Sequence, residues 1–362
     1  MRDYINTSGC SNIYMFIYVC LEEYKMKIDF NYDKKNINAI EGYILKGANY
    51  RCNYARFKTN YRSPAAGTEI VEVYSFEPKK ETRASVLLLH GLGSRNIRFL
   101  LWMGSHLASA GVHCSIPVLP GNYTRVEHNS VSGRSFLYPD LNNMYRFWEN
   151  AVVDIRSTID FLEQKGAWKE NNCIMGYCLG GMLSAITAAV DKRINQIIFM
   201  TTGGYFPKII HESRAAAFVR KQFELGLKDE YYLYDKERLY ETYEKQLEKV
   251  KAMGRLELFS DNDIHPLLKI DPLSYAHFLD KSKITFIDAL FDETIPFGSR
   301  VSLFKEMKGA TRYVLPMTHG SWLPFEIFVA QYILFKVNIS DKASLKQVRK
   351  KVKLDREFFY RE

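Results

Sequence analysis

The sequence predicts an α/β fold in which a mostly parallel sheet carries helices on both faces and a helical lid is inserted. Three observations predict it. From residue 84 onward, short apolar runs typical of buried strands alternate with segments of helical periodicity. A pattern typical of an antiparallel hairpin precedes this alternation. A stretch without strand character, residues 203–280, interrupts it before it resumes.

The strands are expected from two kinds of pattern. Continuous apolar runs indicate parallel strands, because such strands are buried on both faces; these runs are 84–90, 112–119, 173–176, 195–201, 283–289 and 310–315. Before them, residues 56–62 and 69–76 alternate apolar and polar side chains across a turn with Ser63-Pro64 and Gly67. That alternation predicts an antiparallel hairpin at a sheet edge.

Helices are expected between these strands. Residues 150–165 place Val152, Ile155, Ile159 and Leu162 on one face, and Gly166 follows as a stop. The last core helix, residues 325–337, is apolar nearly all round, which predicts deep packing against the sheet. Residues 203–280 are rich in tyrosine and are expected to form a helical lid, with passive helical decoration as the alternative.

These elements divide the chain into four parts. Residues 1–54 are expected to be an N-terminal extension, 55–202 and 281–338 the core, 203–280 the lid, and 339–362 a basic tail. A chain of 362 residues, 47% apolar and 25% charged, is typical of a globular protein with an ample core.

The net charge of +9 is partly concentrated in the tail, where six basic residues crowd together: Lys346, Arg349, Lys350, Lys351, Lys353 and Arg356. A patch for anionic lipid or nucleic acid is one interpretation, and a solvated terminal helix is the other. The sequence has neither an arginine-aromatic RNA motif nor zinc-finger spacing. We therefore expect no nucleic-acid partner and at most a weak peripheral contact with a membrane.

Cysteine usage and the N-terminus bear on the compartment. The six cysteines show no C-x-x-C spacing, which argues against a disulfide framework and a structural zinc site. The apolar patch 13–21 is too short to span a bilayer and lacks the features of a signal peptide. We expect a cytoplasmic protein, which starts at Met1 or at Met26.

Residues 176–181, Gly-Tyr-Cys-Leu-Gly-Gly, follow a short apolar strand and precede an apolar helix. A strand that turns sharply into a helix holds its central residue strained and exposed, and needs glycines such as Gly176 and Gly180 beside it. This pattern predicts a nucleophile elbow with Cys178 as the nucleophile. Its thiol would lie at a helix N-terminus, which favours a thiolate.

A base and an orienting acid are expected later in the chain, in the order nucleophile, acid, histidine. Asp292 lies just past a predicted strand end and is the preferred acid, with Asp288 and then Glu293 as weaker alternatives. His319 lies in the loop after the last strand, beside Gly320. It is the candidate base.

Two further groups of residues belong to the predicted site. Residues 90–94, His-Gly-Leu-Gly-Ser, close the first parallel strand, and Gly91 and Gly93 would let the Leu92 N–H face the site. The Leu179 N–H would be the second oxyanion donor, while His90 is expected to support the loop. In the polar loop that follows, Arg125 and Arg134 are candidate contacts for a substrate anion; the alternative is that both are solvated or pair with Glu127 and Asp140.

These motifs resemble the α/β-hydrolase superfamily across about residues 55–338. The elbow 176–181 is most similar to that of dienelactone hydrolases, which use a Cys-Asp-His triad, and also resembles polyhydroxyalkanoate synthases. The first resemblance implies Cys178 as nucleophile, His319 as base and Asp292 as acid. The chain departs from both, because dienelactone hydrolases lack a large lid and the synthases usually have tryptophan where Phe297 follows Pro296.

The sequence as a whole thus predicts a cysteine-dependent hydrolase of a small carboxylic ester, lactone or thioester that forms a covalent acyl-enzyme. We expect no metal and no organic cofactor. An acyltransferase or polyester synthase with the same three residues is the first alternative. A non-catalytic scaffold with a hydrolase fold is the second.

Overall fold

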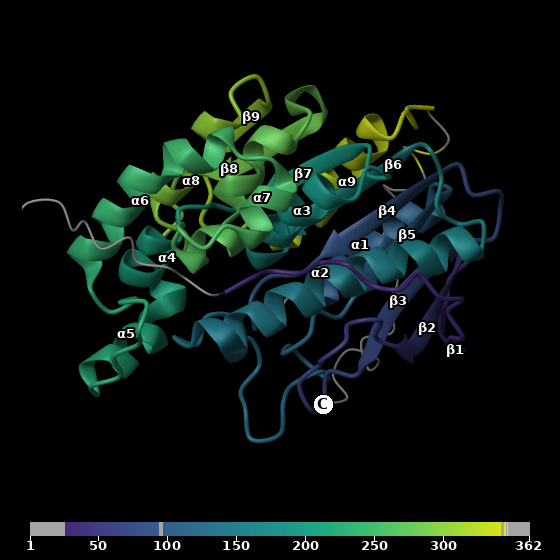
Figure 1. Cartoon of the computed structure of the whole chain (residues 1–362). Coiled ribbons are helices and arrows are strands. Elements are labelled where there is room, and N and C mark those ends of the chain that lie inside the picture. The colour runs from purple at the N-terminus through teal and green to yellow at the C-terminus, as the bar shows by residue number, and fades with distance from the viewer. Residues whose placement is uncertain (1–25, 94–96, 342–343, 345, 347–362) are drawn as a thin grey trace, which may run out of the picture.

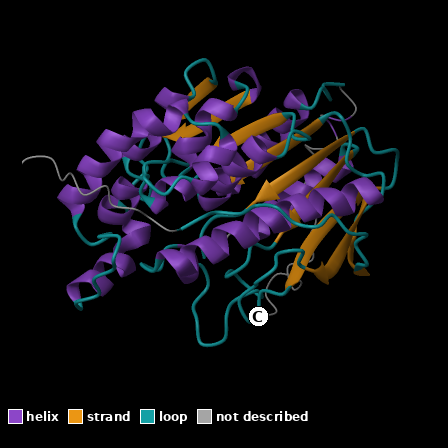
Figure 2. Cartoon of the chain, viewed as in Figure 1, coloured by secondary structure: helices purple, strands orange, loops and turns teal. Residues whose placement is uncertain are grey.

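A nine-stranded sheet lies at the centre of the part of the chain that the structure describes (Figures 1 and 2). The structure is a computed structural model that describes residues 26–93, 97–341, 344 and 346, so the apolar patch 13–21 and the tail beyond Lys346 lie outside it. The strand order is β1-β2-β3-β5-β4-β6-β7-β8-β9. The strands are β1 Ile40–Lys46, β2 Tyr50–Lys58, β3 Ile70–Pro78, β4 Ala84–Leu89, β5 Val112–Pro117, β6 Asn172–Tyr177, β7 Gln196–Met200, β8 Ile284–Ala289 and β9 Thr311–Leu315.

The pairing of the strands confirms the predicted fold class. Strands β1, β2 and β3 pair antiparallel, β3 joins β5 antiparallel, and β5, β4, β6, β7, β8 and β9 pair parallel. Strands β4, β5, β6 and β8 are buried along their whole length, as their continuous apolar runs predict. The expected start of the core at residue 55 lies inside β2, because residues 40–54 pair into the sheet.

Helices cover both faces of the sheet. The crossover through α1 (Ile97–Ser109) leads from β4 to β5, and the one through α2 (Leu141–Gln164) leads back past β4 to β6. Because both crossovers are right-handed, they place their helices on opposite faces. Helix α9 (Glu326–Lys336) packs against α1, and α3 (Leu179–Val190) packs against α2. Helix α8 (Phe297–Glu306) connects β8 to β9.

The last helix packs less deeply than its apolar sequence predicts, because only one of its faces is buried. One face of α9 is buried and includes Val329, Ala330, Ile333 and Leu334, but Phe328 and Phe335 on its other face are 63% and 66% exposed. Burial of one helix face only is the usual result for a helix on the outside of a sheet. The outward face has an apolar character that nothing else in the described chain covers.

The stretch 203–280 is helical between β7 and β8, with no strand in it. It holds α4 (Phe206–Glu212), α5 (Ala217–Glu224), α6 (Lys236–Ala252) and α7 (Arg255–Ser260), followed by short 3-10 turns. Helix α6 buries the face that carries Leu239, Tyr243 and Val250. Among the described helices, none combines the length and apolarity that crossing a membrane requires.

Candidate active site

Cys178 lies at a sharp turn between the end of β6 and the first residue of α3. Its backbone has φ 54° and ψ −115°, a strained conformation for a residue with a side chain. A Cβ atom at Gly176 would lie 2.2 Å from the Gly180 carbonyl oxygen, and one at Gly180 would lie 2.4 Å from that of Leu89. The two glycines are therefore required by the close approach of the chain at this turn. The Cys178 carbonyl accepts hydrogen bonds from Gly181 N at 3.0 Å and Thr202 Oγ1 at 2.7 Å, which hold the turn.

His319 and Asp292 meet through loops that follow neighbouring strands. The Nδ1 atom of His319, after β9, lies 2.8 Å from Oδ2 of Asp292, after β8. The other carboxylate oxygen, Oδ1, accepts from the backbone N–H groups of Thr294 and Ile295 at 2.8 and 2.9 Å. The Asp292 side chain has no exposed surface and that of His319 is 13% exposed. Asp292 is thus fixed by its own turn and fixes the histidine ring in return.

The electrostatic surroundings of His319 favour its protonated form. Burial by itself lowers the pKa of this imidazole, but the attraction of Cys178 and the hydrogen bond to Asp292 outweigh burial and raise the pKa to about 10, from an ordinary value of 6.5. Because the charge on Cys178 contributes to this rise in pKa, the protonation of the histidine depends on the cysteine. Such an arrangement can accept a proton from a thiol and hold it as imidazolium.

The two other carboxylates that the sequence offered as acids have different partners. Asp288 lies within β8, and its carboxylate is bound by Arg300 and Arg312. Glu293 is exposed and pairs with Arg214. The structure therefore brings Asp292 to His319 and leaves Asp288 as a buried structural ion pair.

The two predicted oxyanion donors lie beside Cys178. Leu179 is the first residue of α3, so its N–H has no carbonyl within the helix to bind. Leu92, in the loop after β4, lines the same pocket as Cys178. A Cβ atom at Gly91 would lie only 3.2 Å from that of Cys178, and Gly93, at φ +54°, donates its N–H to Asn122 at 2.8 Å. The loop thus brings its backbone close to the thiol.

His90 supports this loop in the way the sequence led us to expect. Its Nδ1 lies 2.8 Å from the Gly91 carbonyl oxygen, and its Nε2 accepts from Leu119 N at 3.0 Å. Full burial lowers the pKa of His90 to about 4, so the ring is neutral and carries its proton on Nδ1.

A small apolar pocket opens at Cys178, with a cavity volume of about 20 Å³, or room for about one water molecule. Its walls come from the elbow, from the loop after β4 and from α4 and the turn that follows it in the inserted segment. The residues that line it are Leu92, Leu137, Cys178, Leu179, Met182, Ile209, Ser213, Ala215 and Ile295. The insertion therefore contributes one wall of the candidate site.

The two arginines lie apart from this pocket. Arg125 is 1% exposed, and its guanidinium donates to Asp154 Oδ2 at 2.7 Å and to the carbonyl oxygens of Val118 and Thr68. These bonds hold it in the core, so the expectation that Arg125 meets a substrate anion has to be corrected. Arg134 lies over the Phe218 ring and lines an open polar pocket that also contains Asp140 and Glu127.

Aromatic side chains that the sequence analysis did not single out surround the histidine. The Tyr177 ring lies 5.1 Å from that of His319, and the Trp322 ring lies 5.2 Å from that of Tyr177, as centroid distances. Tyr177 directly precedes Cys178 and Trp322 follows His319 by three residues. Their closeness in the sequence to Cys178 and His319 was the one indication of this aromatic stack that the sequence offered.

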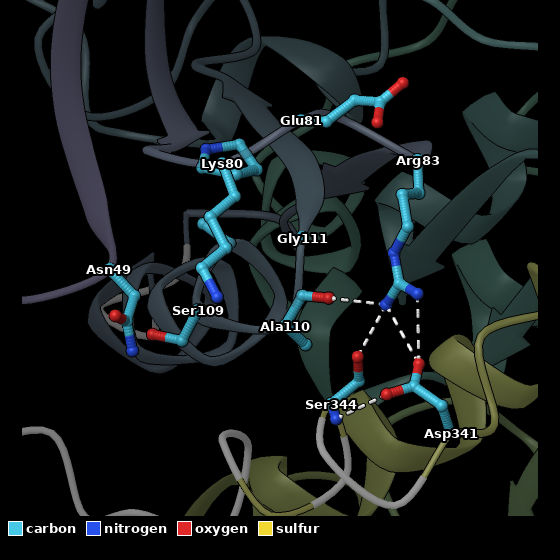
Figure 3. A pocket seen from close by; sticks show the side chains of 11 residues that line it. Asn49, Lys80, Glu81, Arg83, Ser109, Ala110, Gly111, Asp341 and Ser344 are labelled. Atoms are coloured by element: carbon cyan, nitrogen blue, oxygen red, sulfur yellow. Dashed lines mark hydrogen bonds and ion pairs between the residues drawn. The ribbon is translucent and has the colours of Figure 1, made fainter.

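Another pocket lies at the opposite end of the parallel strands, where β4 and β5 begin (Figure 3). Its volume is about 330 Å³. Arg83 crosses it and donates to the Ala110 carbonyl oxygen, to Ser344 Oγ and to Asp341. These bonds attach the end of the described chain to the body of the fold, and none of the predicted site residues lines this pocket.

Comparison with known proteins supports the fold. No family model matches the chain, and no curated protein matches its sequence. The solved structures that it resembles include acetyl xylan esterase 1 from a Thermoanaerobacterium species, with a TM-score of 0.55, 16% identity and coverage of 84% of this chain and 89% of that one. They also include a PEG-bound cold-adapted esterase from an Arctic intertidal metagenomic library (TM-score 0.51, 13% identity, coverage 85% and 100%). The Pyrococcus horikoshii acylaminoacyl peptidase is a third (TM-score 0.53, 12% identity, coverage 83% and 44%). Sheet order, crossovers and these similarities together show that the chain has the α/β-hydrolase fold.

Proposed function

We propose that this protein is an acyl hydrolase in which Cys178 is the nucleophile, His319 the general base and Asp292 the acid that orients it. The observation that carries the proposal is the 2.8 Å contact between His319 and Asp292 beside a cysteine at a strained strand-to-helix turn. The esterases among the structural neighbours support an ester as the class of substrate.

In the proposed reaction, His319 takes the Cys178 proton as the sulfur attacks the carbonyl carbon, or already holds it in a thiolate–imidazolium pair that its raised pKa favours. The Leu92 and Leu179 N–H groups stabilise the oxyanion of the tetrahedral intermediate. His319 then protonates the leaving alcohol or thiol as the carbon–oxygen or carbon–sulfur bond breaks, which leaves a thioester on Cys178. A water molecule, deprotonated by His319, attacks the thioester, and the released thiolate recovers the proton.

The pocket supports a short acyl group. A cavity of about 20 Å³ lined by apolar side chains has room for about a methyl group beside the carbonyl. Met182, Ile209 and Ile295 would contact that group and exclude water from the thioester. An acetyl ester, or a lactone or thioester of similar size at its carbonyl, is the substrate class that this pocket favours.

The test is intact-mass spectrometry after brief exposure to p-nitrophenyl acetate, butyrate and octanoate, with nitrophenol release followed in parallel. Cys178→Ala is the test variant and Cys173→Ala the matched control, because Cys173 is a fully buried thiol on β6 close to the elbow. We expect an acetyl adduct on the wild type and on Cys173→Ala, and none on Cys178→Ala.

The outcomes separate the alternatives. Adduct and turnover that persist in Cys178→Ala would overturn the proposal. An adduct that water releases slowly, but that an added alcohol releases quickly, would instead indicate the acyltransferase. Absence of any adduct on the folded wild type across the panel would count against the proposed short-chain ester specificity.

A further inference from the structure

Most of the large apolar side chains that are exposed in the described ranges lie between residues 290 and 335. All of them except Phe297, on α8, gather at one edge of the sheet, on the edge strand β9, on the outward face of α9 and the turn before it, and on the turn after β8. Without Val314, which faces the other side of the sheet, the set is Leu290, Phe291, Tyr313, Leu315, Phe325, Phe328 and Phe335, each between 41% and 66% exposed. We call this set, with the partly buried Tyr332, the β9–α9 face.

The outward stripe of α9 is regular. Phe328, Tyr332 and Phe335 follow at steps of four and three residues, so they lie on one side of the helix, opposite the face buried against α1. Phe325, in the 3-10 turn before α9, continues the stripe with its ring 6.4 Å from that of Phe328. This spacing is the one by which two helices pack along a common seam.

The face is continuous from the helix to the strand and the turn. The Tyr332 ring lies 5.7 Å from that of Tyr313 on β9 and 6.3 Å from that of Phe335. At the end of β9, the Leu315 carbonyl oxygen accepts from Leu290 N at 2.9 Å. The rings of Phe325 and Phe328 and those of Tyr313, Tyr332 and Phe335 therefore continue from the helix to the strand on one side of the sheet, whereas Val314 faces the other side.

Strand β9 is also an open edge. It pairs with β8 and, in the described part of the chain, with no other strand. Its one charged side chain, Arg312, is bound to Asp288. An edge strand that presents unpaired backbone groups between apolar side chains is a template for pairing with another strand.

The opposite edge of the sheet is built differently. Strand β1 carries Glu41 and Lys46, and a bulge interrupts its pairing between Tyr43 and Leu45. Charges and bulges on an edge prevent pairing between sheets. The chain thus blocks one edge of its sheet and leaves the other, at β9, free to pair.

We propose that the β9–α9 face is the interface of a homodimer, in which β9 of one chain pairs antiparallel with β9 of a second copy. A two-fold axis through the centre of β9, near Tyr313, would join the two sheets into one and set the two α9 stripes against each other. Such an interface is self-complementary, because each copy offers the same strand and the same stripe.

The exposed apolar area of the β9–α9 face agrees with a second copy of the chain as its partner. At about 200 Å² for a whole aromatic side chain, the fractions exposed at Phe291, Phe325, Phe328 and Phe335 amount to roughly 500 Å². Tyr313, Leu290 and Leu315 bring the face near the roughly 800 Å² that each partner of a stable interface buries.

A second copy fits this face better than a lipid surface does. A bilayer would cover the phenylalanines but would leave the free backbone N–H and C=O groups of β9 without hydrogen-bond partners, at a cost of several kcal/mol per group. A second copy would cover the phenylalanines, and its β9 would supply hydrogen-bond partners for these backbone groups. The only charged group of β9 is already neutralised by Asp288, so two copies meet without repulsion between their strands.

The test is sedimentation velocity of the full chain over a range of concentrations, on the wild type, Phe328→Glu/Phe335→Glu and Leu256→Glu. Leu256 on α7 is 78% exposed and lies outside the face, so it is a matched control for an added charge at an exposed apolar position. We expect a dimer at micromolar concentration for the wild type and Leu256→Glu, and a monomer for the double variant, with circular dichroism unchanged in all three.

A second measurement needs no substitution. Hydrogen exchange at the β9 amides of the wild type should slow at least tenfold between a concentration below the dissociation constant and one well above it, while exchange in β1 stays constant. A wild-type monomer at 100 µM, a double variant that still dimerises, or a monomer that binds vesicles of phosphatidylcholine and phosphatidylserine through Phe328 and Phe335 would each overturn the proposal.

Discussion

His319 lies 2.8 Å from Asp292, although 27 residues separate the two in the chain. Each follows the carboxyl end of one of two neighbouring parallel strands, β8 and β9, so the register of that strand pair fixes their approach. A second bond between the two loops, from Phe291 N to the Met317 carbonyl oxygen at 3.0 Å, holds them together. The proposed acid and base thus depend on the strand at the edge of the sheet.

Replacement of Asp292 should affect mainly the activity, whereas replacement of Asp288 should affect mainly the stability. We expect Asp292→Asn to lower kcat/KM on the order of 10³- to 10⁴-fold, because an amide cannot hold the same imidazole tautomer. Asp288→Asn is the matched control, since it should lower the melting temperature, by weakening the bonds to Arg300 and Arg312, but spare most of the turnover. Esterase kinetics and thermal denaturation of both variants check this. Equal losses of kcat/KM in the two would contradict the assignment.

The protonation of His319 should depend on Cys178. With a folded pKa of about 10 against an ordinary 6.5, the interactions of the imidazolium stabilise the folded chain fully below about pH 6.5 and are lost as the pH rises through about 10. Cys178→Ser removes the attraction that contributes most to the rise, so the pKa of His319 should fall in this variant. NMR titration of the ¹⁵N-labelled imidazoles measures the fall.

His90 is the internal reference for that titration, because its pKa of about 4 follows from burial and not from Cys178. An unchanged His319 titration in Cys178→Ser would show that the two side chains do not interact.

The pocket wall should set the acyl chain length. Met182→Ala removes a side chain that lines the cavity, so the best substrate should shift from the acetyl ester toward the butyryl ester, with kcat/KM for butyrate rising about tenfold relative to acetate. Leu183→Ala, one residue further and equally deep in α3, opens space away from the pocket. It should lower stability by about 2–5 kcal/mol and leave the ratio unchanged. A similar shift in both variants would argue against this pocket as the acyl site.

Arg125 should behave as a structural residue and Arg134 as a surface residue. Arg125→Ala leaves Asp154 buried without its cation, which should cost about 3–5 kcal/mol in the free energy of unfolding. Arg134→Ala removes an exposed side chain and should change that free energy by less than about 0.5 kcal/mol. Urea denaturation measures both. A stable Arg125→Ala variant with a raised KM for acidic esters would instead return Arg125 to the substrate site.

Much of the molecule could be predicted locally. The apolar runs predicted the parallel strands to within a few residues, because strands buried on both faces are rich in apolar side chains. The glycines around Cys178 predicted the sharp turn, since a Cβ atom at Gly176 or Gly180 would lie only 2.2–2.4 Å from a backbone carbonyl oxygen. The order of cysteine, aspartate and histidine predicted Asp292 and His319, whose side chains lie 2.8 Å apart in the fold, and proposes Cys178 as their partner.

Other features were decided only when the chain folded. Asp288, Asp292 and Glu293 lie close together in the sequence, which favoured Asp292. Their roles differ in the fold because Asp288 is bound by two arginines, Asp292 contacts His319, and Glu293 is exposed and pairs with Arg214. The sequence places Arg125 in a polar loop and so suggests that it can bind a substrate anion, but in the fold its side chain is buried against Asp154. The apolar outer face of α9 predicted burial, but burial depends on what surrounds a helix, and the described part of the chain leaves that face exposed. The sequence determines which side chains are apolar and are stabilised by burial, whereas only the tertiary arrangement determines which residues contact them.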